Sequence, residues 1–169
     1  MADSTPSRVI VVDANILINF VHAGGLGLLT SLPGYDWVVP EDVVSEITDA
    51  AQRQQLDTAI ANQQLRVETI SGPSDLVQYA ELRRTLGRGE SACVVLAARF
   101  GWLVASDEKG KFLREVTARL GQGRVVNTAG LFVAAIRAGL ITVEDADAAK
   151  SLLEQRRFRL PFSSFWDVL

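Results

Sequence analysis

Apolar residues follow two alternating patterns along the chain. Short runs rich in β-branched residues, typical of buried strands, occur at residues 9–12, 37–39, 102–105 and 124–126. Apolar residues recur at the 3.6-residue spacing of a helix over residues 14–23, 41–51, 75–86, 89–100, 112–120, 128–139 and 143–156. Residues 65–70 fit either a short edge strand or an extended connection. Strands separated by helices predict a three-layer α/β/α fold, in which helices cover both faces of a mainly parallel sheet.

The most apolar run, RVIVVDANILINF over residues 8–20, is interrupted by Asp13 and Asn15. Burying a carboxylate or an amide costs free energy unless the group is paired, hydrogen-bonded or bound to a metal. Either Asp13 caps the helix that begins at the next residue, or the strand delivers polar groups to a functional site. Ligands of parallel α/β sheets bind beyond the carboxyl ends of the strands, which is where Asp13 is expected.

Three further carboxylates stand in comparable places. Asp107 follows a predicted strand, as Asp13 does. Glu46 falls on the apolar side of its predicted helix, and Glu90, in GRGESACVVLA, enters a helix with almost no polar face. Each also has an ordinary explanation: a helix cap for Asp107, a dipole partner for Glu90, and an exposed residue beside the apolar stripe for Glu46.

Four converging carboxylates would repel one another, so such a cluster requires raised pKa values or a bound cation. The chain has one cysteine and one histidine, which excludes an internal disulfide and argues against zinc. Cys93 is expected in the core and His22 at a helix end or on the surface. Oxygen ligands favour Mg²⁺ or Mn²⁺, and a divalent cation can activate water against a phosphodiester.

The net charge of −3 hides a basic segment. Residues 1–82 carry three Arg and eleven Asp or Glu, whereas residues 83–124 carry nine Lys or Arg and four Asp or Glu. Residues 125–169 balance at five and five. The basic segment indicates either solvated helix faces or a phosphate-binding strip. The candidates for phosphate contacts are Arg83, Arg84, Arg88, Lys109, Lys111 and Arg114.

An ordered set of motifs resembles the PIN-domain family, in particular its bacterial branch of toxin-like ribonucleases. The motifs are VVDANILINF, VVPEDVVSEI, LGRGESACVVLA, LVASDEKGKFLRE and VVNTAGLFVAAIRAGLI, and they span about residues 9–145. The family's acidic site corresponds here to Asp13, Glu46, Glu90 and Asp107, with Asn15 and Thr128 as supporting polar residues. The resemblance implies a metal-dependent endoribonuclease that is often dimeric and often inhibited by a cognate antitoxin protein.

Within that resemblance, Asp13, Glu90 and Asp107 are the expected metal ligands, and Glu46 is a ligand or a base that orients water. Two departures favour a single Mg²⁺ (or Mn²⁺) ion. Many relatives carry a further aspartate near the fourth acid, where this chain has Glu108, and Asn127 and Thr128 offer no carboxylate.

The remaining expectations concern organisation and setting. We expect one domain over residues 1–169, with a core at about 8–145 and a C-terminal helix and aromatic tail at 146–169 that packs back. Trp166 is expected to pack, and Phe165 is a candidate for facing a partner. No apolar stretch is long enough for a membrane span, and the first residues lack the pattern of a secretory signal, so a cytoplasmic setting is expected.

Two other functions compete with an RNA-cleaving enzyme. A phosphohydrolase with Asp13 as covalent nucleophile usually has a second aspartate two residues later, where this chain has Asn15. A non-catalytic PIN-like module that binds RNA or protein would use the same fold without the chemistry.

Overall fold

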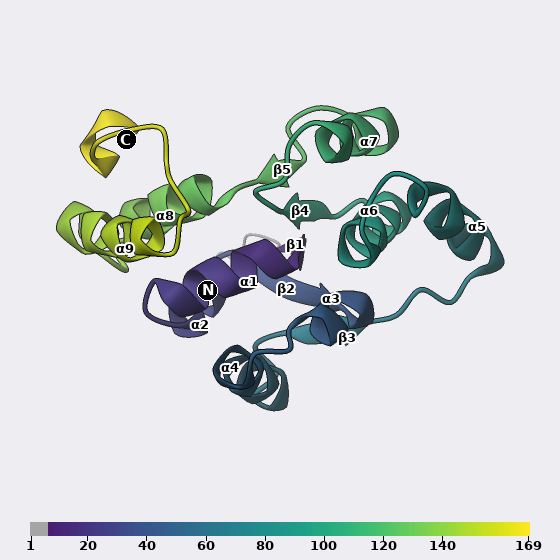
Figure 1. The fold of residues 1–169 in the computed structure, drawn as a ribbon, viewed down its shortest axis with the longest axis horizontal. Helices are drawn as coiled ribbons and strands as arrows, with labels where there is room; N and C mark the ends of the chain where they lie inside the picture. Colours follow the sequence, from purple (N-terminus) through teal and green to yellow (C-terminus); the bar gives the residue numbers. More distant parts are fainter. Residues whose placement is uncertain (1–6) are drawn as a thin grey trace, which may run out of the picture.

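Five parallel strands form the centre of the molecule, which a computed structural model describes over residues 7–169 (Figure 1). The strands are β1 (Arg8–Val12), β2 (Tyr35–Pro40), β3 (Arg66–Glu68), β4 (Leu103–Ala105) and β5 (Val125–Val126). Their order in the sheet is β3-β2-β1-β4-β5. Residues 65–70 therefore contain an edge strand, and the predicted parallel sheet is confirmed.

The chain reverses its direction of travel across the sheet at β1. It first moves outward to β2 and β3, and then returns to place β4 on the other side of β1. In parallel sheets, the crevice beyond the carboxyl ends of the strands at such a switch point is the usual place for a ligand. Val12 is paired with Ala105, so the residues that follow β1 and β4 are neighbours in space.

Helices cover both faces of the sheet. Their bounds are α1 (Ala14–His22), α2 (Leu26–Thr30), α3 (Glu41–Glu46), α4 (Ala50–Ala61), α5 (Pro73–Leu82), α6 (Arg88–Phe100), α7 (Lys111–Leu120), α8 (Thr128–Arg137) and α9 (Val143–Gln155). In Figure 1 the strands run from β3 at the bottom to β5 at the top, with α1, α2, α8 and α9 on the left and α5 and α6 on the right. This is the predicted three-layer arrangement.

The helix predicted over residues 41–51 is wrong, because the structure breaks it in two. Helix α3 ends at Glu46, and Ile47 adopts extended backbone angles (φ −84°, ψ 96°) while its side chain stays buried. Asp49 then caps α4 by accepting a hydrogen bond from the backbone N–H of Gln52. The apolar spacing continues across the break, which is why periodicity alone did not reveal it. Helix α2 was not predicted.

Aromatic contacts hold the C-terminal segment against the core. The ring of Phe132 stacks on that of Phe20, with centroids 5.0 Å apart, and lies 5.7 Å from that of Phe165. A short 3₁₀ helix (Phe165–Asp167) ends the segment. Two expectations are wrong here: Phe165 is fully buried and cannot face a partner, whereas Trp166 is 67% exposed and does not pack.

Among residues 7–169, no helix combines the length and the apolar character that crossing a bilayer requires.

Candidate functional site

Asp13 lies at the switch point of the sheet and is almost fully buried, with 3% of its surface exposed. Its backbone N–H donates to the carbonyl of Ala105, which extends the pairing of β1 with β4 by one residue. Its Oδ1 accepts from the backbone N–H of Ala14 at 2.8 Å, so that Asp13 caps α1. Its Oδ2 accepts from the hydroxyl of Ser106 at 3.0 Å. Asp13 therefore caps α1 and also lies at the end of β1, so its role as a cap does not exclude a role in a functional site.

Asn15 connects the acid that follows β1 with the acids that follow β4. Its Nδ2 lies 3.4 Å from Oδ2 of Asp13 and 3.3 Å from Oε1 of Glu108. Its Oδ1 accepts from the backbone N–H of Asp107 at 3.2 Å. An amide suits this position because it donates to carboxylates and accepts from a peptide N–H at the same time. Asn15 thus fixes the spacing between the two strand ends.

Glu46 reaches the site from the end of α3 and contacts the start of α6. The residue is exposed, and its Oε1 accepts from the backbone N–H of Gly89 at 2.8 Å. A Cβ on Gly89 would lie 2.6 Å from Oε2 of Glu46, so a glycine is required for this approach. The expectation that Glu46 is turned to the apolar side is wrong, although it does point toward its acidic neighbours.

Glu90 is half-buried in the first turn of α6. Its Oε2 accepts from the backbone N–H of Gly87 at 3.3 Å, which is a capping contact. Burial raises the pKa of Glu90, and repulsion from Glu108 and Glu46 adds to the rise. Glu90 therefore stabilises the start of α6, as expected for a residue in the first turn. It also has acidic neighbours, which a capping residue does not need.

The pKa of Asp13 is raised to about 6. Burial is the main cause, and the charges of Glu90 and Glu46 raise it further, against the hydrogen bonds from Ala14 and Ser106. Because electrostatic repulsion falls off with distance, the end of β1, the end of α3 and the start of α6 place their carboxylates in one region at the edge of the sheet. A cation at this edge would remove that repulsion.

Asp107 is held apart from this group by its own partners. Its Oδ1 accepts from the backbone N–H of Thr128 at 2.9 Å, and its Oδ2 accepts from the Thr128 hydroxyl at 2.5 Å. Asn19 donates to the same Oδ2 at 2.9 Å and to the Thr128 hydroxyl at 3.2 Å. Asp107 therefore connects α1, α8 and the end of β4. Thr128 supports an acid, as predicted for it.

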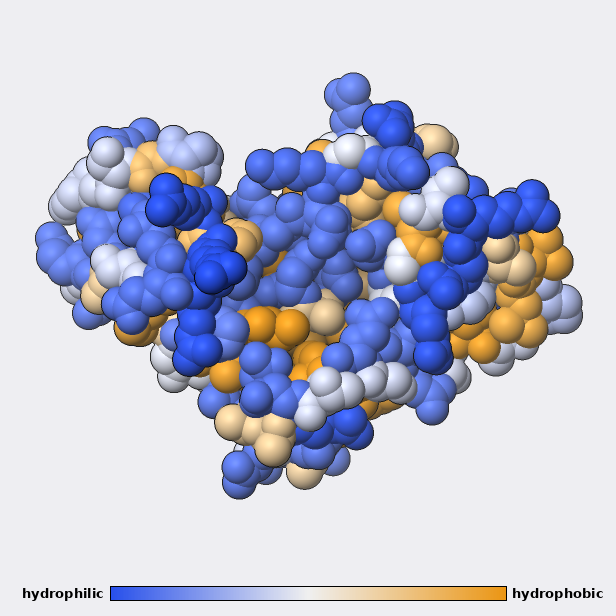
Figure 2. Space-filling view, viewed as in Figure 1, coloured by the Kyte–Doolittle hydropathy of each residue, from blue (hydrophilic) through white to orange (hydrophobic). Residues whose placement is uncertain are grey.

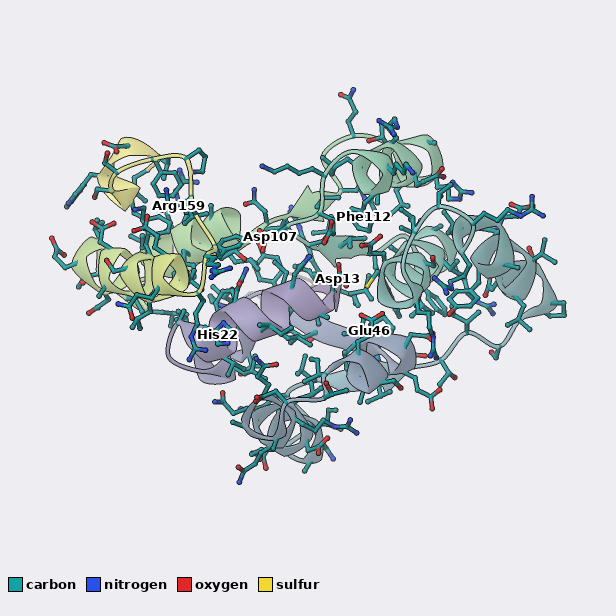
Figure 3. All side chains as sticks on the ribbon, in the orientation of Figure 1. Asp13, His22, Glu46, Asp107, Phe112 and Arg159 are labelled. Carbon is teal, nitrogen blue, oxygen red and sulfur yellow. The ribbon has the colours of Figure 1, made fainter. Side chains whose placement is uncertain are left out.

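A hollow of about 300 Å³ lies beside these groups. It is lined by Ser106, Asp107, Glu108, Lys109, Asn127 and Gly130, among others. Figure 3 shows Asp13, Asp107 and Glu46 gathered near the middle of the molecule, and Figure 2 shows that hydrophilic residues cover this central region. The surface is therefore suited to a polar, charged ligand.

A metal ion at this edge of the sheet would need several oxygen ligands close together. Within residues 7–169, no group of three or more His, Cys, Asp or Glu side chains is arranged closely enough to hold one. The chemistry of the donors nevertheless fits a hard cation, because the charged groups whose repulsion raises the pKa values of Asp13 and Glu90 are all carboxylates. Asn15 turns its Nδ2, not its oxygen, toward Asp13. Glu46 and Glu90 each accept a hydrogen bond from a backbone N–H, and each side chain would have to leave that bond to share a cation with Asp13.

The predicted phosphate-binding strip is only partly available. The guanidinium of Arg88 donates to Asp42 at 3.0 Å, and that of Arg83 donates to the carbonyl of Leu86 at 2.8 Å. Arg84, Lys109, Lys111 and Arg114 are exposed and form no ion pair within the described part of the chain. Lys109 and Lys111 adjoin the acidic group through Glu108, so the start of α7 is the basic part nearest to the site.

The sequence was compared with protein-family models, and the model "DUF3368: PIN domain" matches residues 9–169. The chain belongs to the PIN-domain family. The match extends through the C-terminal tail, beyond the region that the motifs cover. PIN domains are generally nucleases and typically use divalent metals. A comparison with curated proteins gave no significant match.

The sequence of this PIN domain did not reveal three polar residues of the site. Ser106 donates to Asp13 and accepts from the backbone N–H of Glu108 at 3.1 Å. Asn19 is buried between Asp107 and Thr128. Glu108 was noted only as a departure from relatives, yet it faces Asn15 and raises the pKa of Glu90. Asn19 follows Asn15 by one helical turn, so the sequence places both amides on the same face of α1.

The single cysteine lies in the core and the single histidine lies at a helix end, as predicted. Cys93 is fully buried in α6, and burial raises the pKa of its thiol well above the ordinary value. His22 lies in the last turn of α1, 3.3 Å from the amide of Gln52. Burial and the nearby charge of Arg156 lower its pKa. The charges of Asp13, Glu46 and Glu90 add to the rise at Cys93, so its thiol lies beneath the acidic group, whereas none of these three acids affects His22.

Proposed function

We propose that this PIN domain is a Mg²⁺-dependent (or Mn²⁺-dependent) endoribonuclease. The observation that carries the proposal is the buried carboxylate of Asp13 at the switch point of the sheet, with the charges of Glu46 and Glu90 close enough to raise its pKa. A folded chain gains nothing from this repulsion, and a cation would turn it into attraction. Family membership supports a nuclease.

Asp13, Glu90 and Asp107 are the proposed metal ligands, with Glu46 orienting a water and accepting its proton. A divalent cation bound there would lower the pKa of a water and stabilise the oxygens of a phosphodiester. Asn15 holds the two strand ends at a fixed spacing, and Thr128 holds Asp107. Glu108, which faces Asn15, is a candidate to join them.

We further propose that the protein is the toxin of a toxin–antitoxin pair, acting on RNA in the cytoplasm. The support is the ordered set of motifs, which resembles the toxin-like branch of the family. A cognate antitoxin protein and a homodimer are the partners that this branch implies.

The test is metal binding measured by calorimetry, followed by RNA cleavage. We expect Mg²⁺ or Mn²⁺ to bind the wild type and not the double variant Asp13→Asn/Glu90→Gln. The wild type should then cleave RNA in a metal-dependent way, and chelation by EDTA should abolish cleavage. Glu68→Gln is the matched control, because it neutralises a carboxylate in β3 that pairs with Arg66. Absence of binding in the wild type would contradict the proposal.

One observation favours a second candidate, a non-catalytic module that holds RNA or protein. The oxygens of Asp107 both accept hydrogen bonds within the protein, and the described side chains form no ready ligand cluster. Such a module would bind RNA equally well with EDTA and would never cleave it, which separates the two candidates.

A further inference from the structure

Three arginines lie within four residues directly after α9. Arg156, Arg157 and Arg159, here called the arginine arm, are all exposed. None of them forms an ion pair with residues 7–169. The segment 125–169 has balanced charge as a whole, but Glu154, the acid nearest in sequence, is paired with Lys150 instead. Three unpaired guanidinium groups so close together form a local positive surface.

The fold holds the arginine arm in place. The side chains of Phe158, Leu160 and Phe162 pack against the core on either side of Arg159. Farther along, Asp147 accepts from the hydroxyl of Ser164 at 2.6 Å and from the backbone N–H of Phe165 at 2.9 Å. The arm is therefore anchored at both ends rather than being a loose tail.

The backbone at Arg157 is left-handed, with φ at +65°. This residue follows the C-cap of α9, where helices commonly end in this conformation, and the N–H of Phe158 donates to the carbonyl of Leu153 to close the helix. Glycine or asparagine would fit the turn with less strain, yet the chain has arginine there.

Arg159 and α7 lie on opposite sides of the acidic group in the view of Figure 3, while the charge of Arg156 reaches His22 at the other end of α1. In Figure 3 the labels of Asp107 and Asp13 lie between Arg159, on the C-terminal segment, and the region of α6 and α7. Figure 2 shows strongly hydrophilic residues on the C-terminal segment at the left of the central region. The exposed cations on the α7 side are Lys109, Lys111 and Arg114.

We propose that the arginine arm binds the phosphate backbone of single-stranded RNA, opposite the cations of α7, so that the strand crosses the carboxylates between them. The inference rests on the proposed function, because it assigns the substrate path of that site. Carboxylates repel a polyanion, and cations on both flanks would offset this repulsion. Guanidinium groups suit phosphate because they donate in a planar fork, and none of these three forms an ion pair with a described carboxylate.

The test compares RNA affinity among variants that all carry Asp13→Asn, so that no RNA is cut. The probe is fluorescein-labelled oligouridine, and binding is measured by anisotropy over a range of salt concentrations. Each phosphate contact on a single strand contributes about 0.7 to the slope of log K against log salt. Replacing the three arginines with Gln should lower the slope by about 2 and weaken binding about 100-fold near 0.1 M salt. Replacement with Lys should preserve most of the slope.

The control variant replaces Arg53, Arg66 and Arg119 with Gln. These arginines are paired with Asp57, Glu68 and Glu115, and the loss of net charge is the same. The inference is overturned if the arm variant, folded by circular dichroism, binds like its Asp13→Asn parent. It is also overturned if the control loses as much affinity, or if oligoglutamate competes as well as oligouridine.

The outcomes for cleavage and for binding are separate. A wild type that cleaves RNA, beside an arm variant with unchanged affinity, would leave the proposed function standing and refute the arm. A wild type that never cleaves, beside an arm variant that loses affinity as calculated, would refute the nuclease and retain the binding surface.

Discussion

Replacing Asp13 with Asn should stabilise the metal-free protein at neutral to alkaline pH. The pKa of Asp13 rises from an ordinary 3.8 to about 6 in the folded state. Each unit corresponds to 1.36 kcal/mol, so ionised Asp13 costs about 3 kcal/mol of folding free energy above pH 6. Asn retains an oxygen to cap α1 but loses the acceptor for Ser106, at about 1 kcal/mol. The net gain is about 2 kcal/mol.

The pH dependence has a definite sign. Because the folded-state pKa is raised, the contribution of Asp13 to stability is present at low pH and is lost as the pH rises through about 6. The advantage of Asp13→Asn should therefore be largest near pH 8 and fall to nearly zero near pH 4.5, where the wild type regains about 2 kcal/mol. Other carboxylates titrate in both proteins, so their effects cancel in the difference.

The assay is urea unfolding of both proteins in EDTA at the two pH values. Added Mg²⁺ should then stabilise only the wild type, since a ligand that binds the folded state alone raises its stability. A variant that is less stable than the wild type near pH 8, or a difference that does not change with pH, would refute the reasoning. Either result would mean that Asp13 is not buried among repelling carboxylates.

Three further outcomes are expected. Gly89→Ala should weaken Mg²⁺ binding in calorimetry by about 10- to 100-fold, because its Cβ would displace Glu46; Gly87→Ala, whose Cβ would lie 3.8 Å from the nearest atom, should not. Thr128→Val removes a hydroxyl that donates to a carboxylate and should lower the free energy of unfolding in urea by about 1–3 kcal/mol. Cys93 is fully buried, so a thiol reagent should modify it only at the rate of global unfolding; rapid modification of the native protein would contradict this.

The sequence predicted the fold and the strand-end acids because both depend on local patterns. A buried run followed by a carboxylate, as at Asp13, is visible without coordinates. The break after Glu46 was not, because Ile47 continues the apolar spacing while its backbone leaves the helix. Asn19 lies in an apolar stretch and acquires its partners only when β4 and α8 arrive. The net charge of residues 125–169 is zero, and this balance hides the three neighbouring arginines of the arginine arm.

The return of the chain to β1 has a consequence for the protein during its synthesis. Asp13 leaves the ribosome early, whereas its hydrogen-bond partner Ser106 lies 93 residues later. The cradle of Asp107 also requires Thr128. A growing chain therefore carries its first acid long before that acid has neighbours, and the acidic group is complete only when nearly the whole sheet has assembled.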